Sequence, residues 1–401
     1  MIAPSPLLIP TPRQNDPSSG VATTPQTVAP EPVPQLVQPP VPPPSNLDIP
    51  EVADATGRGG ASSRPLGWHT VGSTSHIARL SSSQAAEVLH RRSHRGAGKI
   101  RALPHTTADA PKVLASAPVS TASACDDCAQ ANIKKTSHTG TLSAPAPEPG
   151  SLHLDLKEMV VSIGSGFRYI VYMTDEHSRY VFYDFIKRKS EVVSAVGRCI
   201  AAFEATVGTP TDENGRALPR PRVRQLHSDR EGKLMSHEFK DLRAKYPLHH
   251  TVSPPEDHDL NPIAERIIGV ISETATAVRA GAHAPPGFWP WAIAYAVDWH
   301  NASVTSVGSS TADANLTPHQ RFTLRPPRVM DLASFGCRAV VRKSDVHQHK
   351  PSLSTRGSIG VFLGRSRNSK GAYDVLVPGN RIITSSSVLV NEEYFDWAPA
   401  E

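Results

Sequence analysis

The chain has 401 residues, which suggests two to three structural units. Hydrophobic residues make up 38% of it, which is low for one globule, but 15 of its 38 prolines fall in residues 1–50, so the proline excess is local. The net charge of +5 favours a polyanionic partner, the four cysteines are too few for a secreted disulfide scaffold, and no apolar run is long enough to cross a membrane.

Residues 1–66 are rich in Pro, Ser, Thr, Ala and Gln. The stretch QPPVPPPSN favours extended polyproline geometry and cannot build a packed core. We therefore predict a disordered, proline-rich N-terminal tail over residues 1–66. The alternative is that this segment is a ligand for a proline-recognising domain.

Residues 67–142 carry two histidines and two cysteines at spacings typical of a zinc site. The stretch SSSQAAEVLHRRSH predicts a short helix on which His90 and His94, four residues apart, share a face. The pair Cys125 and Cys128 follows as C-x-x-C. Two imidazoles and two thiolates form a closed tetrahedral Zn²⁺ site, which would hold together a region whose core looks thin. We therefore predict a small helical zinc-binding module here.

Other interpretations of this region stay open. The C-x-x-C pair alone fits a redox centre, and HRRSH alone fits a basic helical patch. The stretch ALPHTTADAPKVLASAPVSTASA between the two pairs looks loose, without a helical or strand pattern. The remaining cysteines, Cys199 and Cys337, are predicted to be core residues.

Residues 148–312 alternate between strand-like and helix-like patterns. Two runs rich in β-branched and aromatic residues, separated by EHSR, predict a β-hairpin, and Ser236 is the predicted N-cap of a short helix. In chain order the patterns predict strands at 152–156, 167–175, 180–186, 223–229 and 248–254, and helices at 190–208, 236–246, 262–279 and 287–303. This order predicts an α/β fold with a mixed sheet flanked by helices.

Three acidic residues stand out in this region. Asp155 and Asp229 each end a strand-like run in the pattern His-x-Asp, and Glu265 opens a helical run after 35 intervening residues. Each aspartate shares a strand face with its histidine, and the two aspartates converge if their strands are neighbours. Two strand carboxylates and one helix carboxylate suit a pair of Mg²⁺ ions acting on a phosphodiester. The alternative is three unrelated surface carboxylates.

The helix that contains Glu265 has two distinct faces. One is an apolar stripe formed by Ala264, Ile267, Ile268, Ile271 and Ala275. The other carries small residues beside the glutamate: Gly269, Ser272 and Thr276. This second face would leave room for a DNA backbone next to Glu265.

Two further sets of residues have both a structural and a functional interpretation. An arginine-rich loop before the Asp229 strand either contacts phosphates or is simply solvated; it contains Arg216, Arg220, Arg222 and Arg224. The tryptophans of FWPWAIAYAVDWHN are predicted to pack in the core, with a dimer contact as the alternative; they are Trp289, Trp291 and Trp299.

Residues 313–401 differ in pattern and charge from the preceding region. The runs IGVFLG, YDVLV and RIITSSSVLV predict short strands, joined by turns such as PGN at 378–380. Residues 321–370 hold eleven Lys/Arg and two acids, a local charge of +9. We predict a basic, β-rich C-terminal appendage that is either a nucleic-acid face or a solvated, loop-rich surface.

Taken in order, these motifs resemble the integrase portion of a copia-type LTR retrotransposon polyprotein, over about residues 85–396. HRRSH followed by CDDC resembles the zinc-binding N-terminal module of that family. LHLDLK, YIVYMTDEHSRYVFYDFIKRKSEV, LHSDREG and NPIAER resemble its RNase H-like catalytic core and its D, D-x35-E triad. FWPWAIAYAVDWHN, LTPHQRF, SFGCRAVV and GSIGVFLGRSRNSKGAYDVL resemble the segments that follow the core.

The resemblance implies 3′-end processing of element DNA and its strand transfer into a target. Asp155, Asp229 and Glu265 would be the catalytic ligands of Mg²⁺ or Mn²⁺, and the zinc module would hold Zn²⁺. It further implies double-stranded DNA as the partner, a homo-oligomer, no membrane contact and a nuclear location. The predicted DNA contacts are Asn261, Arg266, Arg222, Arg224, Arg342 and Lys343.

Two segments depart from the family pattern. Glu-Gly-Lys stands at 231–233 where Gly-Gly-Glu is common, and His-Asp-Leu-Asn-Pro stands at 258–262 where Pro-Gln-Gln-Asn-Gly is usual. Proline at the end of the second segment stiffens a loop that glycine would leave mobile. Two alternatives therefore stay open: a decayed or host-adopted nucleic-acid-binding protein without catalysis, and an RNase H-like nuclease.

Overall fold

The computed structural model describes residues 67–72, 77–117, 125–131, 146–228, 236–252, 262–305, 315–342 and 355–397. All of them belong to one compact unit, Pro43–Glu401. The predicted disordered tail at 1–66 lies outside the described residues. No helix in the described ranges is both long enough and apolar enough to cross a membrane.

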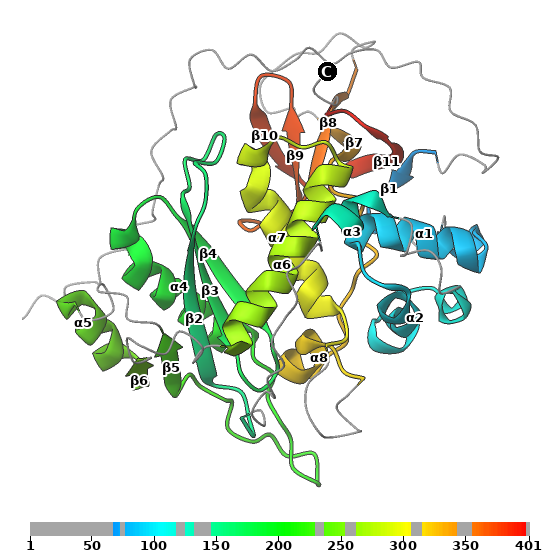
Figure 1. Cartoon of the computed structure of the whole chain (residues 1–401). Coiled ribbons are helices and arrows are strands. Elements are labelled where there is room, and N and C mark those ends of the chain that lie inside the picture. The colour runs from blue at the N-terminus through cyan, green and yellow to red at the C-terminus, as the bar shows by residue number, and fades with distance from the viewer. Residues whose placement is uncertain are drawn as a thin grey trace, which may run out of the picture. The chain divides into compact units, whose positions relative to one another are not determined.

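Figure 1 labels the helices and strands of this unit. The α-helices are α1 (Ser82–Ser93), α2 (Ala97–Thr106), α3 (Asp126–Ala131), α4 (Val192–Thr206), α5 (His237–Lys245), α6 (Pro262–Gly281), α7 (Trp289–Ala302) and α8 (Pro318–Thr323). Short 3-10 helices are η1 (Ile77–Arg79), η2 (Lys112–Ser116), η4 (Lys189–Glu191) and η7 (Pro286–Phe288). The strands are β1 (His69–Thr70), β2 (Ser151–Glu158), β3 (Tyr169–Asp175), β4 (Val181–Ile186), β5 (Gln225–Ser228), β6 (His249–Val252), β7 (Cys337–Arg342), β8 (Gly357–Arg365), β9 (Tyr373–Val377), β10 (Arg381–Ser385) and β11 (Val388–Phe395).

The first sheet has five strands in the order β4-β3-β2-β5-β6. β3 pairs antiparallel with β4 and with β2, whereas β5 is parallel to both β2 and β6. The predicted mixed sheet and the predicted β3–β4 hairpin are thus confirmed. Ser236 accepts a hydrogen bond from the Phe239 backbone N–H (3.3 Å), which confirms the predicted cap of α5.

The two faces of this sheet pack against different helices. Leu152 and Leu154 of β2 are buried in a core with α4, whereas Ile170 and Tyr172 of β3 are buried in a core with α6 and α7. Figure 1 shows α4 on one side of the sheet and α6 and α7 on the other. Because strand side chains alternate, the side chains between and after the two leucines of β2 face α6.

The apolar surfaces of α6 and α7 form the larger core. The five residues of the stripe predicted on α6 are all buried, as predicted. Trp289 and Trp299 of α7 are also buried, and Trp291 packs partly buried against the same cluster. Trp289 donates from Nε1 to the Val160 carbonyl at 2.8 Å, which satisfies its polar atom. Core packing is therefore confirmed for these tryptophans.

The second sheet has six strands in the order β1-β11-β7-β8-β9-β10, and all its neighbouring pairs are antiparallel. Gly379 (φ 80) and Asn380 (φ 55) form the predicted turn between β9 and β10, in left-handed conformations that these two residue types tolerate. β1 pairs with β11, so a segment near residue 70 completes the sheet. Cys337 is buried here and Cys199 is buried in α4, as predicted.

One strand prediction is wrong. RIITSSSVLV forms two strands, β10 at the sheet edge and β11 between β1 and β7. A bend separates them, closed by a hydrogen bond from the Ser387 backbone N–H to Ser385 Oγ (3.0 Å). Serine hydroxyls compete with ladder hydrogen bonds in this way, and the apolar pattern alone does not reveal it.

The prediction of a loose stretch after the first helix is also wrong in part. α2 and η2 lie within or overlap this stretch, and Ile100, Leu103 and Leu114 are buried in the same core as α6 and α7. Pro104 inside α2 hides the helical signal, because proline removes a backbone donor from a helix interior. Burial of the apolar side chains offsets that loss, and this region shares its core with the central helices.

A buried ion pair joins α1 to the second sheet. Arg92 and Glu392 are 1% and 2% exposed, and Arg92 donates from Nε and Nη2 to the two carboxylate oxygens. Glu392 also accepts hydrogen bonds from the backbone N–H and the hydroxyl of Ser334. Burial alone would raise the pKa of Glu392, but Arg92 and the hydrogen bonds hold it well below its usual range.

Removing one member of this pair should destabilise the protein. We expect Glu392→Met to lower the free energy of unfolding by about 3–5 kcal/mol, because Arg92 is left charged and buried without its partner. Urea unfolding followed by circular dichroism measures the change. Arg91→Met is the matched control, since Arg91 is the exposed neighbour on the same helix. Equal stability of Glu392→Met and the wild type would contradict the structural role given to the pair.

Candidate metal centre and carboxylate site

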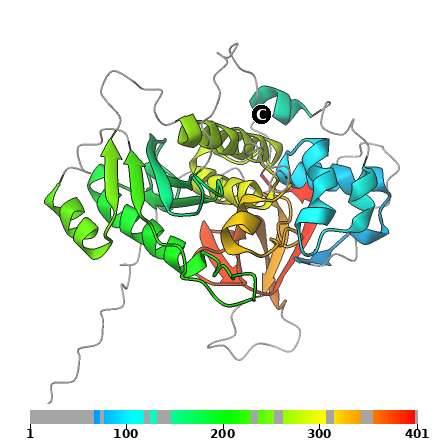
Figure 2. The same cartoon turned by 90° about the horizontal axis from the view of Figure 1, so that it is seen from below.

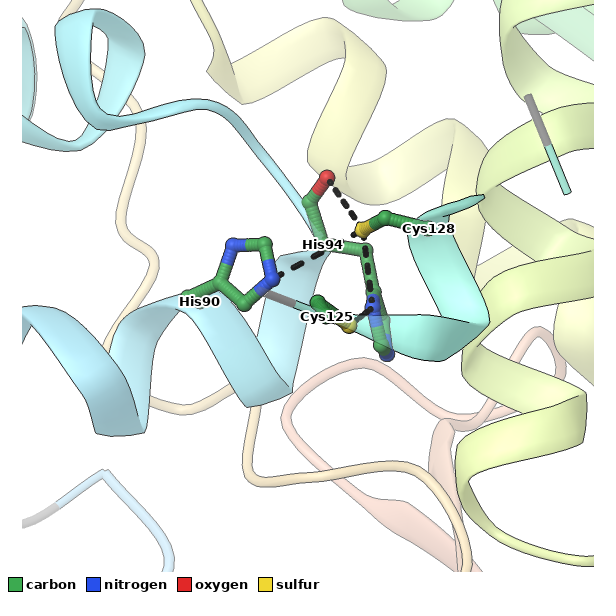
Figure 3. Close-up of side chains that lie close together, drawn as sticks. All are labelled: His90, His94, Cys125 and Cys128. Carbon is green, nitrogen blue, oxygen red and sulfur yellow. Dashed lines mark hydrogen bonds between the residues drawn. The ribbon is translucent and has the colours of Figure 1, made fainter. Parts of the chain in front are cut away.

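Four predicted zinc ligands come together between α1 and α3. Figure 3 shows His90, His94, Cys125 and Cys128 with their side chains turned toward one another. Cys128 Sγ lies 3.4 Å from His94 Nδ1 and 3.6 Å from His90 Nε2, and Cys125 Sγ lies 3.5 Å from His94 Nδ1. All four ligand atoms lie within 4.8 Å of one another. Within the described residues, this is the one group of three or more His, Cys, Asp or Glu side chains arranged to hold a metal ion.

The distances in this cluster match a tetrahedral zinc site. Zn–S bonds of about 2.3 Å and Zn–N bonds of about 2.0–2.1 Å place neighbouring ligand atoms about 3.3–3.8 Å apart. The three separations of 3.4, 3.5 and 3.6 Å fall inside that range. The donor set of two imidazoles and two thiols also suits Zn²⁺ better than Mg²⁺ or Ca²⁺, which prefer oxygen ligands. The residues therefore fit the ion.

The two histidines reach this point from different backbone conformations. α1 begins with a capping box, in which Ser81 and Gln84 exchange hydrogen bonds, and it ends at Ser93. His94 is the C-cap with φ 49, so it is not on the helix face that His90 occupies. The prediction that both histidines share one helical face is therefore wrong in detail. The left-handed cap turns the second imidazole back toward the first.

The surroundings of the cluster favour a neutral His94 and a protonated Cys128. His90 Nδ1 donates to the Arg95 carbonyl at 2.9 Å, which leaves Nε2 directed at Cys128. Burial and the nearby His90 lower the pKa of His94 to about 4, so its imidazole is neutral at pH 7. Burial and the neighbouring Cys125 raise the pKa of the Cys128 thiol to about 12. Zn²⁺ would therefore displace a thiol proton on binding.

The metal cluster is braced by the C-terminal end of α6. A Cβ atom at Gly281 would lie 2.8 Å from Asp127 Oδ2 and 3.4 Å from His94 Nε2. We expect Gly281→Ala to push the Asp127 side chain aside and to destabilise the protein by up to about 1 kcal/mol, because the atom that the new Cβ meets is the end of a side chain. Zinc retention during dialysis and the thermal midpoint measure this.

Gly269→Ala on the same helix is the matched control for that change. A Cβ atom there would meet nothing within 4 Å, and alanine favours helix by up to about 1 kcal/mol over glycine. If both variants had the same stability and zinc content, close packing at Gly281 would not brace the cluster.

The face of the first sheet that turns toward α6 carries polar residues. His153, Asp155 and Lys157 lie on this face of β2, opposite to the buried leucines. The rings of His153 and His227 are 5.4 Å apart across the parallel β2–β5 pair. Asp155 is half-buried, and its Oδ1 accepts a hydrogen bond from the Leu156 N–H at 2.8 Å. The sheet thus places His153 and Asp155 of the first His-x-Asp pattern beside His227 of the second.

Glu265 lies in the first turn of α6, on its exposed side. Lys157 Nζ donates to Ser272 Oγ at 3.0 Å and joins the polar face of β2 to the small-residue face of α6. Ser272 is two helical turns after Glu265 and therefore on the same side of the helix. Sequence reasoning missed Lys157 as a residue of this site. The i, i+2 spacing from Asp155 in LHLDLK is the signal that identifies its face.

Several predicted site residues lie outside the described residues. These are Asp229, Asn261 and Lys343, together with the departures at 231–233 and 258–261. β5 ends at Ser228, one residue before Asp229. The other predicted DNA contacts are exposed: Arg222, Arg224, Arg266 and Arg342. Arg224 forms an ion pair with Glu148, so it is not purely a solvated loop residue.

The sequence relatives of this chain are transposon polyproteins. No protein-family model matches the chain. The retrovirus-related Pol polyproteins of transposons RE2 and RE1 from Arabidopsis thaliana are each 23% identical to it, over 274 and 279 residues. Each match covers 68% of this chain, but the chain spans only 17% of the length of these relatives.

Two solved structures are similar to parts of the chain. One is from a simian T-cell lymphotropic virus intasome, at 14% identity and a TM-score of 0.38, covering 75% of this chain and 95% of that one. The other is the HTLV-2 integrase catalytic core domain in complex with magnesium, at 15% identity and a TM-score of 0.32, covering 44% and 97%. The resemblance predicted from the motifs is confirmed by the sequence relatives: the chain is similar to the integrase region of an LTR retrotransposon polyprotein.

Proposed function

We propose that this protein is a DDE-type integrase, a metal-dependent polynucleotidyl transferase that processes DNA 3′ ends and joins them to target DNA. The parallel pairing of β2 with β5 carries the proposal. It sets the strand of Asp155 beside the strand that ends one residue before Asp229. The polar face of β2 is bonded through Lys157 to α6, whose first turn carries Glu265. The relatedness to retrotransposon polyproteins supports the same activity.

Asp155, Asp229 and Glu265 would hold Mg²⁺ or Mn²⁺, since carboxylate oxygens suit these hard ions. When bound, a pair of such ions activates the nucleophile and stabilises charge in an in-line displacement at phosphorus. The Leu156 N–H orients the Asp155 carboxylate. Lys157 adds a positive charge on the same face, which favours the approach of a DNA phosphate.

The domain organisation proposed for this activity follows the sequence prediction. Residues 67–142 would be an HHCC zinc-binding module, 148–312 an RNase H-like catalytic core, and 313–401 a basic β-rich region. His90, His94, Cys125 and Cys128 would bind Zn²⁺, a proposal supported by ligand-atom separations that match tetrahedral coordination. The zinc would hold α3 against α1 and α6.

The partner in this proposal is double-stranded DNA, both element ends and target. The exposed arginines at 222, 224, 266 and 342, with Asn261 and Lys343, would contact its backbone. Joining two DNA ends to one target requires more than one active site, which supports a homo-oligomer. A nuclear location would follow from such a substrate.

Nicking of supercoiled plasmid tests the proposal without knowledge of the element's own ends. We expect the wild type to nick the plasmid in Mg²⁺ or Mn²⁺ and Asp155→Asn to lose that activity while still binding DNA. DNA binding without nicking by the zinc-loaded wild type would favour the alternative of a binding protein without catalysis. Nicking without any DNA joining would favour an RNase H-like nuclease.

A further inference from the structure

A second group of charged residues gathers on a different side of α6. A cavity of about 140 Å³ is lined by Lys99, Arg179, Arg266, His300 and Thr305, and by three apolar residues of α6. An adjoining cavity of about 220 Å³ shares Lys99 with it and is also lined by Arg95. The lining residues come from α2, the β3–β4 turn, α6 and α7. Figure 2 shows α6 and α7 between the first sheet and the helices of residues 82–106.

Two of these arginines are buried with polar atoms that lack a partner in the described part of the chain. Arg95 and Arg179 are each 6% exposed. Nε and Nη2 of Arg95, and Nη1 of Arg179, are buried and meet no acceptor there. In Arg92, the same two nitrogens, Nε and Nη2, donate hydrogen bonds to the carboxylate of Glu392. The guanidinium edge of Arg95 that suits a bidentate oxyanion is thus buried without a hydrogen-bond acceptor, although the Glu273 carboxylate is near enough to favour its charge.

The nearby carboxylates do not neutralise the smaller cavity. None of its lining residues, all within the described chain, is acidic. Asp175 accepts hydrogen bonds from the Gly150 N–H and from Ser178, and Glu176 contacts Ser151 and His153. Glu273 lines the adjoining cavity on the Arg95 side. Asp175 and Glu176 favour the charged form of Arg179, but their hydrogen bonds go to other groups. The smaller cavity itself is therefore lined by cations and by no anion within the described chain.

His300 and Lys99 are two further polar residues that line the smaller cavity. His300 Nε2 donates to the Arg179 carbonyl at 3.1 Å, and burial followed by the nearby Arg95 cation lowers the pKa of His300 to about 3. It is thus a neutral support for the turn that carries Arg179. Burial and Arg95 lower the pKa of Lys99 to about 8, which leaves it mostly charged at pH 7. Buried cations destabilise a protein unless an anion compensates them.

We propose that this cationic cavity binds a phosphate group. Guanidinium and ammonium donors converge there as they do in protein sites for phosphates. The smaller cavity, about 140 Å³, is large enough to admit a phosphate group. The exposed Arg266 lies on its solvent side, one residue after Glu265, so a phosphate enters from the surface of α6. The group belongs either to a nucleic-acid backbone or to a small free phosphate.

Thermal unfolding of the full, zinc-loaded chain without Mg²⁺ tests this inference separately from any DNA chemistry. Inorganic phosphate, added against chloride at matched ionic strength, is expected to raise the thermal midpoint by about 5 °C at saturation. We expect Arg179→Gln to weaken the apparent dissociation constant at least about tenfold, since a hydrogen bond to a charged group is lost. Lys99→Gln is the second variant, and the exposed Arg381→Gln on β10 is the matched control.

These measurements distinguish phosphate binding in the cavity from a general effect of ionic charge. In the absence of phosphate, Arg179→Gln and Lys99→Gln should be as stable as the wild type or more so, because the first removes a buried cation and the second a half-buried one. The proposal would be overturned if phosphate raised the thermal midpoint of the wild type no more than chloride does. It would also be overturned if phosphate raised the midpoints of Arg179→Gln and Arg381→Gln equally. If a short DNA duplex abolishes the rise in midpoint caused by phosphate, the ligand is a phosphate of the DNA backbone. If the rises caused by the duplex and by phosphate add, the ligand is a free phosphate. Both of these last results support the site.

Discussion

Glu265→Gln should reduce metal-dependent DNA nicking at least about a thousandfold. The amide has the shape of the carboxylate but carries no charge, so it is a poor ligand for a hard divalent cation. The metal supplies several kcal/mol of transition-state stabilisation, and a loss of about 4 kcal/mol corresponds to about a thousandfold in rate. The rate is measured on supercoiled plasmid at saturating Mn²⁺.

Asp241→Asn is the matched control for this variant, since Asp241 is an exposed acid on α5. It should keep the wild-type rate. Because Glu265 is exposed at the start of α6, its replacement should leave the protein folded and its zinc content unchanged. Undiminished nicking by Glu265→Gln, with the protein folded, would remove this residue from the active site.

Cys128→Ser should release zinc and lower the thermal midpoint by about 10 °C or more. The serine hydroxyl is not a thiolate ligand, and a three-ligand site holds Zn²⁺ far less tightly. The midpoint of a chain of about 400 residues falls by about 1–2 °C per kcal/mol lost, and a structural zinc site contributes about 10 kcal/mol or more. Zinc per chain, measured by atomic absorption after dialysis, should fall from one to near zero.

Cys199→Ala distinguishes loss of zinc from loss of a buried thiol. Cys199 is buried in α4, away from the four ligands, so this variant should lose some packing energy but retain its zinc. If Cys128→Ser kept a full equivalent of zinc, or if the wild type purified without any, the cluster would not be a metal site. The redox interpretation of the cysteine pair would then gain support.

Local sequence patterns predicted the parts of the fold that local forces determine. The β3–β4 hairpin, the Ser236 cap and the apolar stripe of α6 follow from β propensity, capping chemistry and helical periodicity. The carboxylate site was predicted on the condition that β2 and β5 are neighbours, and the structure meets that condition with a parallel pair. The catalytic roles of Asp155 and Glu265 stay predictions.

The remaining features depend on contacts between distant segments. The left-handed cap at His94 arises where the chain leaves α1, and β1 joins β11 across more than half of the sequence. Arg95 and Arg179 look like ordinary surface arginines in the sequence, and only the packing of α2, α6 and α7 makes them buried. No local pattern encodes which distant cations will share a cavity.

Joining of a labelled DNA duplex to supercoiled plasmid tests the central claim most directly. The zinc-loaded protein, with Mg²⁺ or Mn²⁺ and a duplex carrying a free 3′-hydroxyl, should produce labelled plasmid. Asp155→Asn and Glu265→Gln should produce none while binding the duplex normally. Joining at an equal rate by these variants would contradict a reaction at the carboxylates of β2 and α6, and nicking of the plasmid without joining would contradict an integrase.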